Sequence, residues 1–405
     1  MSSSQGFSFS HILRTLPFLR PKKSMLQRRV NHLRKFISYA AEDLSTPAHD
    51  VDYSRLHMTW VIPDFKPGAG GHMTIFRIVR YLEEFGHKVD FLIQNPTEHE
   101  TGEEAHESIN DHFQPFNGKV TLFKETFPEV TGDALIATDR FTCYPVNAMN
   151  GFTRKFYFVQ DFEPSFYPMG SEYLLAEATY HLDFDCLCAG DWLHKIMSER
   201  YGRWSMSWPL AYDHAVYNSS PDIPRIENRI AVYARYATPR RAVELIYLAL
   251  DILQQRGVDF EVAFFGQNLG KLDVEYPHSD HGLLNAEGLA DLYRRAAIGV
   301  VFSATNHSLV NKEMMACGLP VLDLDLENVR AVFPNECMAF ATPTPDGIAD
   351  QLQTLLEHQQ ERQRLHHAGL KYVQPFSWEN SARLIEKALR TRVNYALTGG
   401  GHGEA

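Results

Sequence analysis

The chain has 405 residues, of which 44% are apolar and 12% aromatic, and its formal net charge is −11. This length exceeds what one hydrophobic core usually organises, so we expect two domains, and the apolar content excludes a disordered chain. The acidic balance makes nucleic acid an unfavourable partner, because both molecules would carry negative charge.

The five cysteines are odd in number and lie mostly inside apolar runs: Cys143, Cys186, Cys188, Cys317 and Cys337. We interpret them as reduced core residues of a cytoplasmic protein. Cys186 and Cys188 have no matching Cys or His pair, so a zinc site is not expected. We also expect neither a membrane span nor a secretion signal, because no apolar run has the required length or flanks.

Residues 1–56 form a basic extension. No Asp or Glu occurs up to Ala41, while Leu26, Val30, Leu33 and Ile37 recur at helical spacing. We therefore predict a basic amphipathic helix. We favour its location on an anionic membrane surface, where each base near the lipid contributes about 1 kcal/mol. The alternative is a helix packed on its own domain with a solvated basic face.

After this extension, buried strands alternate with helices, which is typical of a parallel, doubly wound sheet. The predicted strands are HMTWVIP, KVDFLIQ, KVTLF, DALIATD, KFYFVQD and FDCLCAG. They predict a Rossmann-like domain over residues 57–217. A linker rich in Pro, Ser and Asn follows at Asn218–Arg229.

Alternation then restarts and predicts a second Rossmann-like domain over residues 229–375, with a helix from Pro239 to Gln255. A last helix over residues 376–395 begins near Trp378, with Ser377 as its N-cap. The expected fold is therefore α/β, with two Rossmann-like domains facing each other across a cleft. Ligands of such sheets bind beyond the carboxyl ends of the strands.

A glycine-rich loop follows the first predicted strand. Gly70 and Gly71 end the sequence GAGG at the start of a helix, where backbone N–H groups can face phosphate or sugar oxygens. A plain tight turn explains the same residues equally well.

Two arginines in the segment YARYATPRRAVEL are the next candidates. Arg235 ends a buried strand, and Arg240 lies at the start of the following helix, where a cation opposes the helix dipole. A bound diphosphate would compensate both charges, so we predict that the two arginines grip one. The alternative is a pair of surface arginines that meet Asp or Glu.

The stretch FSATNHSLVNKEMMACGLPVLDL combines a polar loop with a short buried helix. Glu313 lies one turn into that helix, and a carboxylate beside a cleft can accept hydrogen bonds from two ribose hydroxyls. His307 and Ser308 in the loop are candidates for contact with the donor sugar or phosphate, and a loop-capping role is an equal alternative.

A third candidate region is VQDFEPSFY. Asp161 and Glu163 follow a strand, so they are placed to meet the hydroxyls of an acceptor or a sugar. Tyr167 adds aromatic surface of the kind on which sugars stack. An aromatic core with acidic helix N-caps is an alternative of the same weight.

These stretches resemble the GT-B glycosyltransferases, in particular the large retaining family numbered four. The resemblance is carried by Pro67, Gly70, Gly71, Leu82, Gly86, His87 and Val89, by Arg235 with Arg240, and by the segments EMMACGLPV, AEGLADLYRRAAIGVVFS and PFSWENSARLIEKAL. It implies a nucleotide-sugar donor, a final helix that crosses back to the first domain, and no metal or other cofactor. With the acid proposed above, it implies a catalytic group of Arg235, Arg240, Glu313 and Asp161.

Two positions depart from that family. The glutamate that the family has eight residues before the ribose-binding one is replaced by Thr305, and IATDRFTCYP offers Thr138 and Asp139 where the family has an acceptor histidine. Thr305 motivates one alternative, a catalytically silent subunit of a polysaccharide assembly complex. A GT-B nucleotide-sugar epimerase is another.

The stretches FVQDFEPSFYPMGSEYLLAEATY and YARYATPRRAVEL are similar to the bacterial rhamnosyltransferases of the WsaF type. This similarity implies transfer of L-rhamnose from dTDP-L-rhamnose to a lipid-linked or polysaccharide acceptor, such as a growing O-antigen. The expected location is the inner face of the bacterial plasma membrane. The sequence does not decide whether the chain forms a homodimer or binds other proteins of polysaccharide assembly.

Overall fold

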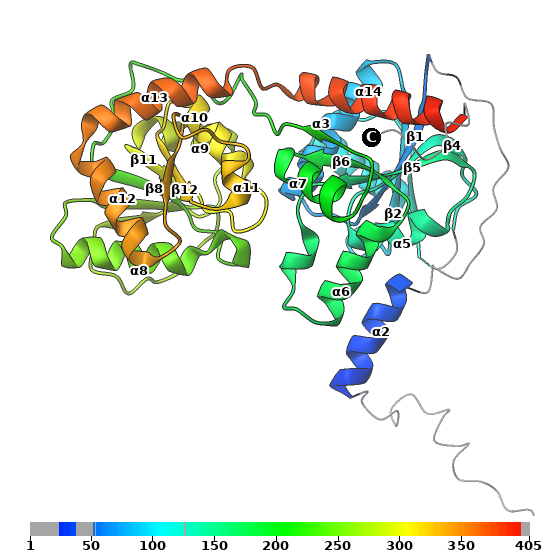
Figure 1. The fold of residues 1–405 in the computed structure, drawn as a ribbon, viewed down its shortest axis with the longest axis horizontal. Helices are drawn as coiled ribbons and strands as arrows, with labels where there is room; N and C mark the ends of the chain where they lie inside the picture. Colours follow the sequence, from blue (N-terminus) through cyan, green and yellow to red (C-terminus); the bar gives the residue numbers. More distant parts are fainter. Residues whose placement is uncertain (1–23, 38–51, 53, 125–126, 398–405) are drawn as a thin grey trace, which may run out of the picture.

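The structure is a computed structural model that describes residues 24–37, 52, 54–124 and 127–397. Most of the predicted basic extension therefore lies outside the described residues. The rest forms two domains side by side, each built on its own parallel sheet (Figure 1). This confirms the predicted α/β fold with two Rossmann-like domains.

The first sheet has seven parallel strands in the order β3-β2-β1-β4-β5-β6-β7. Its strands are β1 (His57–Pro63), β2 (Lys88–Gln94), β3 (Val120–Phe123), β4 (Gly132–Ala137), β5 (Phe152–Val159), β6 (Asp185–Ala189) and β7 (Ser205–Trp208). The helical segments are α3 (Gly70–Glu84), α4 (Gly102–His112), α5 (Arg140–Ala148), η3 (Glu163–Phe166), α6 (Ser171–Ala178), η4 (Thr179–His181), α7 (Asp191–Lys195) and η5 (Ile196–Arg200). The strand order reverses between β1 and β4, so the loops after these two strands border a natural ligand crevice.

The second sheet has six parallel strands in the order β10-β9-β8-β11-β12-β13. They are β8 (Arg229–Tyr233), β9 (Glu261–Phe265), β10 (His278–Asp280), β11 (Ile298–Val300), β12 (Val321–Leu324) and β13 (Ala339–Ala341). The helical segments are η6 (Pro239–Arg241), α8 (Val243–Gln255), α9 (Ala286–Arg295), α10 (Leu309–Ala316), α11 (Glu327–Arg330), α12 (Pro345–Glu357) and α13 (Gln359–Val373). The expected strands are present, and the sequence analysis missed the short strands β7, β10 and β13.

The helix predicted from Pro239 is interrupted, which corrects the expectation. Residues Pro239–Arg241 form a 3-10 turn, and Ala242 has a left-handed φ of 43° before α8 begins. The left-handed residue redirects the backbone, so Arg240 and Arg241 occupy a separate turn instead of the first turn of α8.

The C-terminal helix α14 (Trp378–Leu397) crosses back over the first domain and packs against α3 (Figure 1). Ser377 caps it as predicted, because its hydroxyl accepts a hydrogen bond from the Asn380 N–H at 3.2 Å. The buried His87 imidazole lies 3.0 Å from Glu386 of α14. The other ring nitrogen, Nδ1, accepts a hydrogen bond from the Leu56 N–H, so Nε2 is protonated and donates a hydrogen bond to the Glu386 carboxylate. The Gly-His segment after α3 therefore anchors this helix.

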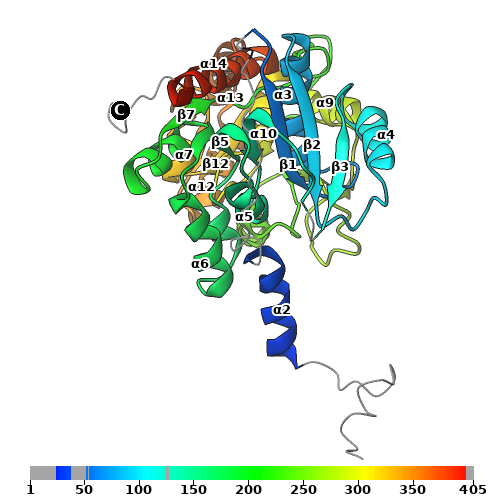
Figure 2. The same ribbon diagram turned by 90° about the vertical axis from the view of Figure 1, so that its right-hand side faces the viewer.

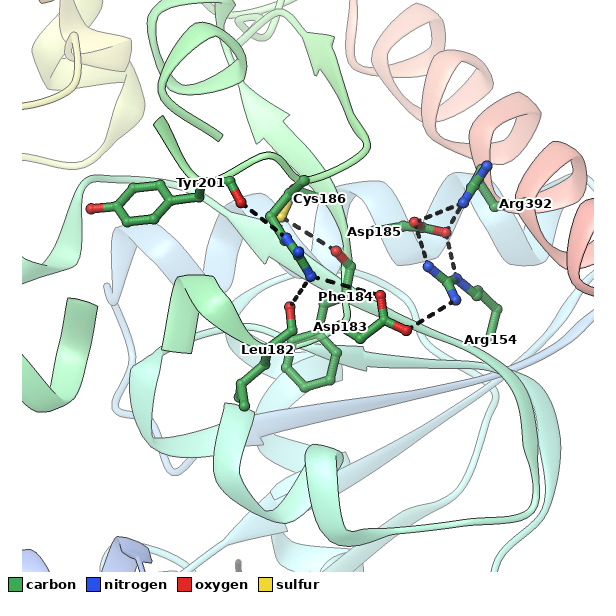
Figure 3. A network of polar contacts seen from close by, with 9 residues as sticks. Arg154, Leu182, Asp183, Phe184, Asp185, Cys186, Tyr201 and Arg392 are labelled. Carbon is green, nitrogen blue, oxygen red and sulfur yellow. Dashed lines mark hydrogen bonds and ion pairs between the residues drawn. The ribbon is translucent and has the colours of Figure 1, made fainter. Parts of the chain in front are cut away.

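A second anchor joins α14 to β5 and the start of β6 (Figure 3). The buried Asp185 carboxylate accepts two hydrogen bonds from Arg154, at 2.7 and 2.8 Å, and two from Arg392 of α14, at 2.8 and 3.2 Å. Two forked guanidinium groups thus satisfy one buried carboxylate, which makes its burial tolerable.

The predicted basic helix forms α2 (Met25–Ile37), which packs against α5 and projects from the first domain (Figures 1 and 2). Met25 and Leu26 are 73% and 72% exposed, while Val30 and Leu33 are half-buried. The apolar stripe of α2 is therefore only partly covered by its own domain. Within the described ranges, no helix combines the length and apolar character that crossing a bilayer demands. All five cysteines are buried and free, as expected for core residues.

Candidate active site

A cavity of about 570 Å³ lies between the two domains, at the carboxyl ends of the strands of both sheets. Every predicted site residue except Glu313 lines it: Gly70, Gly71, Asp161, Glu163, Tyr167, Arg235, Arg240, His307 and Ser308. Residues separated by more than 200 positions in the chain thus meet in one cleft. The placement agrees with the rule for ligands of doubly wound sheets.

The glycine-rich loop leads from β1 into α3 and opens on the cavity. Gly68 has a left-handed φ of 83°, and no side chain caps the N-terminus of α3. A Cβ added at Gly70 would meet nothing within 4 Å. Packing therefore does not require glycine here, and the open space leaves the helix N-terminus available to an anionic group.

Arginines dominate the wall formed by the second domain. The exposed guanidinium of Arg235 has no hydrogen-bond or ion-pair partner in the part of the chain that the structure describes. Arg240 lies 3.2 Å from Asp161 and 4.5 Å from the Phe166 ring, both in the first domain. Arg241, which the sequence analysis did not select, also lines the cavity and donates to Ser303 Oγ at 3.0 Å.

Asp161 connects the two domains. Its Oδ1 accepts from the backbone N–H of Asn306 at 2.9 Å, and its Oδ2 faces Arg240. The Asn306 amide donates to the carbonyls of Gln160 and Ala189 at 2.9 and 2.8 Å. Both carboxylate oxygens of Asp161 therefore contact groups of the second domain. Its predicted contact with an acceptor stays a prediction.

The loop before α10 presents His307 and Ser308 to the cavity. His307 Nδ1 donates to Asn306 Oδ1 at 3.0 Å, which leaves Nε2 as an acceptor without a hydrogen-bond partner in the described chain. Burial, together with the nearby Lys312 and Arg241, holds the pKa of His307 well below its usual value. The imidazole is therefore neutral. The Ser308 hydroxyl caps α10 by accepting from the Val310 N–H at 3.3 Å, which is the capping role left open above.

Glu313 lies behind the cavity wall rather than in it. Leu309 and Val310 line the cavity, but one turn later Glu313 is 7% exposed and faces Tyr217 and Arg77. Burial raises the pKa of this carboxyl to about 7, against the opposing effects of Arg77 and the Tyr217 hydroxyl. The structure thus does not bring Glu313 together with the other predicted residues, and its contact with a ribose remains a prediction.

The first domain supplies a different wall, around Glu163 and Tyr167. It also contains Asp139, which was named only as standing where the family has a histidine, and Arg140, which the prediction missed, both at the start of α5. Arg140 lies between the rings of Phe141 and Tyr167, with its Cζ 3.9 and 3.8 Å from their centres. The position of Asp139 could be anticipated from the sequence, because Asp139 is the last residue of the predicted strand DALIATD, two residues beyond the end of β4.

Two models of protein domains match this chain. The model of the WsaF C-terminal domain matches residues 228–353, and that of the WsaF N-terminal domain matches residues 131–188. The first covers β8 to β13 and most of α12, and the second covers β4 to β6 with the acidic wall. The match to the N-terminal domain model thus precedes the match to the C-terminal domain model in this chain.

The O-antigen biosynthesis protein RfbC of Myxococcus xanthus is 28% identical over 352 residues, or 84% of this chain. The chain spans only 27% of that relative. Anabaena HepE in complex with UDP and glucose has a TM-score of 0.64 at 13% identity, over 83% of this chain and all of HepE. WaaG, a glycosyltransferase involved in lipopolysaccharide biosynthesis, has a TM-score of 0.59 at 13% identity, over 82% of this chain and 99% of WaaG.

The sheets, the interdomain cavity and these structural neighbours define the class: the chain has the GT-B fold of glycosyltransferases. Within that class, the two domain matches make it a WsaF-like protein.

Proposed function

We propose that this chain is a glycosyltransferase that moves a sugar from a nucleotide-sugar donor to a bacterial surface polysaccharide such as O-antigen. The observation that carries the proposal is Arg235, which has no partner among the described residues and lines, with Arg240, the same cavity as the N-terminus of α3. The names of the relatives support the pathway, because RfbC is an O-antigen biosynthesis protein and WaaG acts in lipopolysaccharide biosynthesis.

In the proposed reaction, the bond between the sugar C1 and the donor phosphate breaks while the acceptor oxygen bonds to C1. The diphosphate gains negative charge as it leaves, and guanidinium groups aimed at it stabilise this charge without reorganisation. We place the acceptor on the same face of the sugar as the leaving group, so the configuration is retained and a phosphate oxygen takes the proton. No bound metal is part of this proposal.

For the donor we propose dTDP-L-rhamnose, on the basis of the WsaF-like domains. The test incubates the protein with dTDP-L-rhamnose, UDP-glucose or UDP-N-acetylglucosamine and a rhamnose-terminated oligosaccharide. We expect dTDP release and an extended oligosaccharide only with the rhamnose donor, unchanged by EDTA. Donor conversion without an acceptor would favour the epimerase, and nucleotide binding without turnover would favour the silent subunit.

For the location we propose that α2 lies on an anionic membrane at the cytoplasmic face. The helix carries Arg28, Arg29, Arg34 and Lys35 and no acidic residue. Met169 and Leu174, at the start of α6, are 82% and 59% exposed, and both helices project from the same side of the first domain (Figures 1 and 2). Bases beside exposed apolar side chains suit a lipid surface.

The membrane proposal is tested by sedimentation with phosphatidylcholine vesicles that contain phosphatidylglycerol. We expect binding that weakens with salt and that the double change Arg28→Glu with Arg29→Glu removes. The exposed Arg383 on α14, changed to Glu, is the control. Equal sedimentation of both variants would contradict the role of α2.

A further inference from the structure

A second hollow between the two domains, of about 390 Å³, shares no lining residue with the candidate active-site cavity. The first domain contributes to it the turn after β5 and the helical segments α7 and η5, and the second domain contributes the loop after β11 and α11. The helices α7 and α11 contact each other across the domain boundary (Figure 1). Trp192 of α7 is the largest side chain in the lining, so we call this hollow the Trp192 pocket.

One contact between the domains separates the Trp192 pocket from the active-site cavity. The Asn306 N–H donates to the Asp161 carboxylate at 2.9 Å. Asp161 lines the cavity, whereas the next residue, Phe162, lines the pocket. On the other strand of this contact, His307 lines the cavity, whereas Thr305 lines the pocket. The two hollows therefore lie on either side of the bonded pair, and a ligand of the pocket is not in the place where we propose that transfer occurs.

Thr305 supplies the observation that points to a ligand. The residue is 5% exposed, and its Oγ1 has no hydrogen-bond partner among the residues that the structure describes. Buried hydroxyl groups are normally paired, because an unpaired one destabilises the folded chain. Since Thr305 lines the pocket, a hydroxyl of a ligand bound there can supply the missing partner. A water molecule is the alternative partner, and the experiments below separate the two.

Two aromatic rings give the pocket its apolar surface. The Trp192 ring is half-buried and meets the Phe162 ring edge-on, with 6.3 Å between the ring centroids and 72° between the ring planes. The guanidinium of Arg200 lies 5.6 Å from the centre of the Phe162 ring. A half-buried indole presents a large flat apolar face next to polar groups. A sugar ring, which is apolar on its C–H face and polar around its edge, matches this arrangement.

The charged side chains around the pocket balance one another. Lys195 and Arg200 carry positive charge, and Glu199 and Glu327 carry negative charge. All four are exposed, and the Lys195 ammonium lies 3.4 Å from the Glu327 carboxylate across the domain boundary. The pocket is therefore close to neutral, unlike the arginine wall of the cavity. Such a site does not attract a phosphate, whereas donors and acceptors of both kinds suit an uncharged group with several hydroxyls.

We propose that the Trp192 pocket is a second carbohydrate site, which binds one uncharged sugar unit of a polysaccharide outside the cavity in which transfer takes place. A hydroxyl of this sugar pairs with Thr305 Oγ1, and its apolar face lies on the Trp192 ring. No covalent bond forms or breaks at this site. The inference rests on the proposed glycosyl transfer and adds that the protein holds the polymer at a unit that does not react.

Calorimetry with a rhamnose hexasaccharide and the full chain measures binding at the site. Thr305→Val removes the hydroxyl and keeps the branched shape, so we expect binding to weaken roughly 3- to 10-fold, which corresponds to one neutral hydrogen bond. The melting temperature should stay the same or rise, because the variant loses an unpaired buried hydroxyl. Thr305→Ser keeps the hydroxyl and should bind like wild type. Thr391→Val, at an exposed threonine of α14, is the matched control and should also bind like wild type.

Trp192 adds a spectroscopic readout that a purely structural role would not give. A sugar that stacks on the indole changes the surroundings of the ring, so the hexasaccharide should shift the tryptophan fluorescence of wild type. This shift should be absent in Trp192→Phe, which keeps a ring but removes the indole signal. Trp192→Ala removes the flat surface, and we expect it to weaken binding about tenfold or more. A fluorescence shift that persists in Trp192→Phe would show that the sugar lies against another tryptophan and would overturn the proposal.

Transfer kinetics show whether the site lies outside the reaction centre. Methyl α-L-rhamnoside is too short to reach both the cavity and the pocket. In Thr305→Val, kcat/KM for the hexasaccharide should therefore fall roughly 3- to 10-fold relative to kcat/KM for the rhamnoside. An equal fall for both acceptors would place Thr305 in the reaction centre and overturn the proposal.

The binding data keep this inference separate from the proposed function. If no donor is consumed but both Thr305→Val and Trp192→Ala weaken hexasaccharide binding, the second site stands and only the transferase proposal fails. If the hexasaccharide does not bind wild type, or binds wild type and both variants alike, the pocket holds water alone and the second site is overturned.

Discussion

The two walls of the cavity differ in charge. The second domain presents Arg235, Arg240 and Arg241, of which Arg240 forms an ion pair with Asp161, whereas the first domain surrounds Arg140 with Asp139 and Glu163. A positive wall suits a group whose negative charge grows during the reaction, and a balanced wall suits a neutral nucleophile. In the proposed reaction, each domain would thus serve a different one of the two substrates.

The largest effect is expected at the anchor that fixes α14 to the first domain. Asp185→Asn removes a buried charge from between Arg154 and Arg392 and leaves two guanidinium groups without their carboxylate. Breaking a buried ion pair from one side costs about 3–5 kcal/mol of unfolding free energy. Urea unfolding measures this loss. Asp183→Asn is the matched control, because Asp183 is 69% exposed and lies 3.6 Å from the same Arg154, so it should change stability by less than about 1 kcal/mol.

Arg235→Ala tests the positive wall. We expect kcat to fall by about 100- to 1,000-fold, because a donor aimed at the developing charge is lost. Stability should hardly change, since the side chain is exposed and unpaired within the described chain. Arg383→Ala on the exposed face of α14 is the control and should retain full activity. Full activity in the Arg235 variant would show that the diphosphate lies elsewhere.

Asn306→Ala tests whether the two walls must be held together. The side chain donates across the domain boundary to Gln160 and Ala189, and its loss leaves two carbonyls unsatisfied. We expect roughly 1–3 kcal/mol less stabilisation of the closed arrangement, seen as a KM about tenfold higher for both substrates. The control is Asn268→Ala, an exposed asparagine of the second domain. Unchanged kinetics would mean that the ion pair between Asp161 and Arg240 is sufficient to keep the two domains in the closed arrangement.

The last prediction concerns a dependence on pH, which the buried acid of the first wall contributes. The folded-state pKa of Glu163 is about 8, above its ordinary value of 4.5, so the native protein holds a proton that the unfolded chain releases between these values. The stability that this proton confers is complete below the unfolded pKa and is lost as pH rises towards 8, by at most about 1.4 kcal/mol per pH unit. Thermal unfolding from pH 5 to 8 should show a shallower decline for Glu163→Gln, whereas the exposed Glu379→Gln should follow wild type.

The residue types of both walls could be read from the chain. Alternating apolar runs predicted both sheets, because the period of burial is local, and nine of the residues near strand ends that were selected as site residues line the cavity. The capping of α14 by Ser377 and the burial of α10, which contains Glu313, were also predicted, because both depend on residues close together in the chain.

Partnerships between distant residues could not be predicted, because they depend on how the domains pack. Asp161 and Asn306 are separated by 145 positions, and only the docking of the two domains decides that they bond. Tertiary packing also turns Glu313 towards Tyr217 and, within the first domain, places Arg140 between two rings. The sequence by itself thus determined which secondary-structure elements form and where charge gathers. The tertiary structure alone decided which charges neutralise one another, because Coulomb and hydrogen-bond energies depend on distances that no local pattern contains.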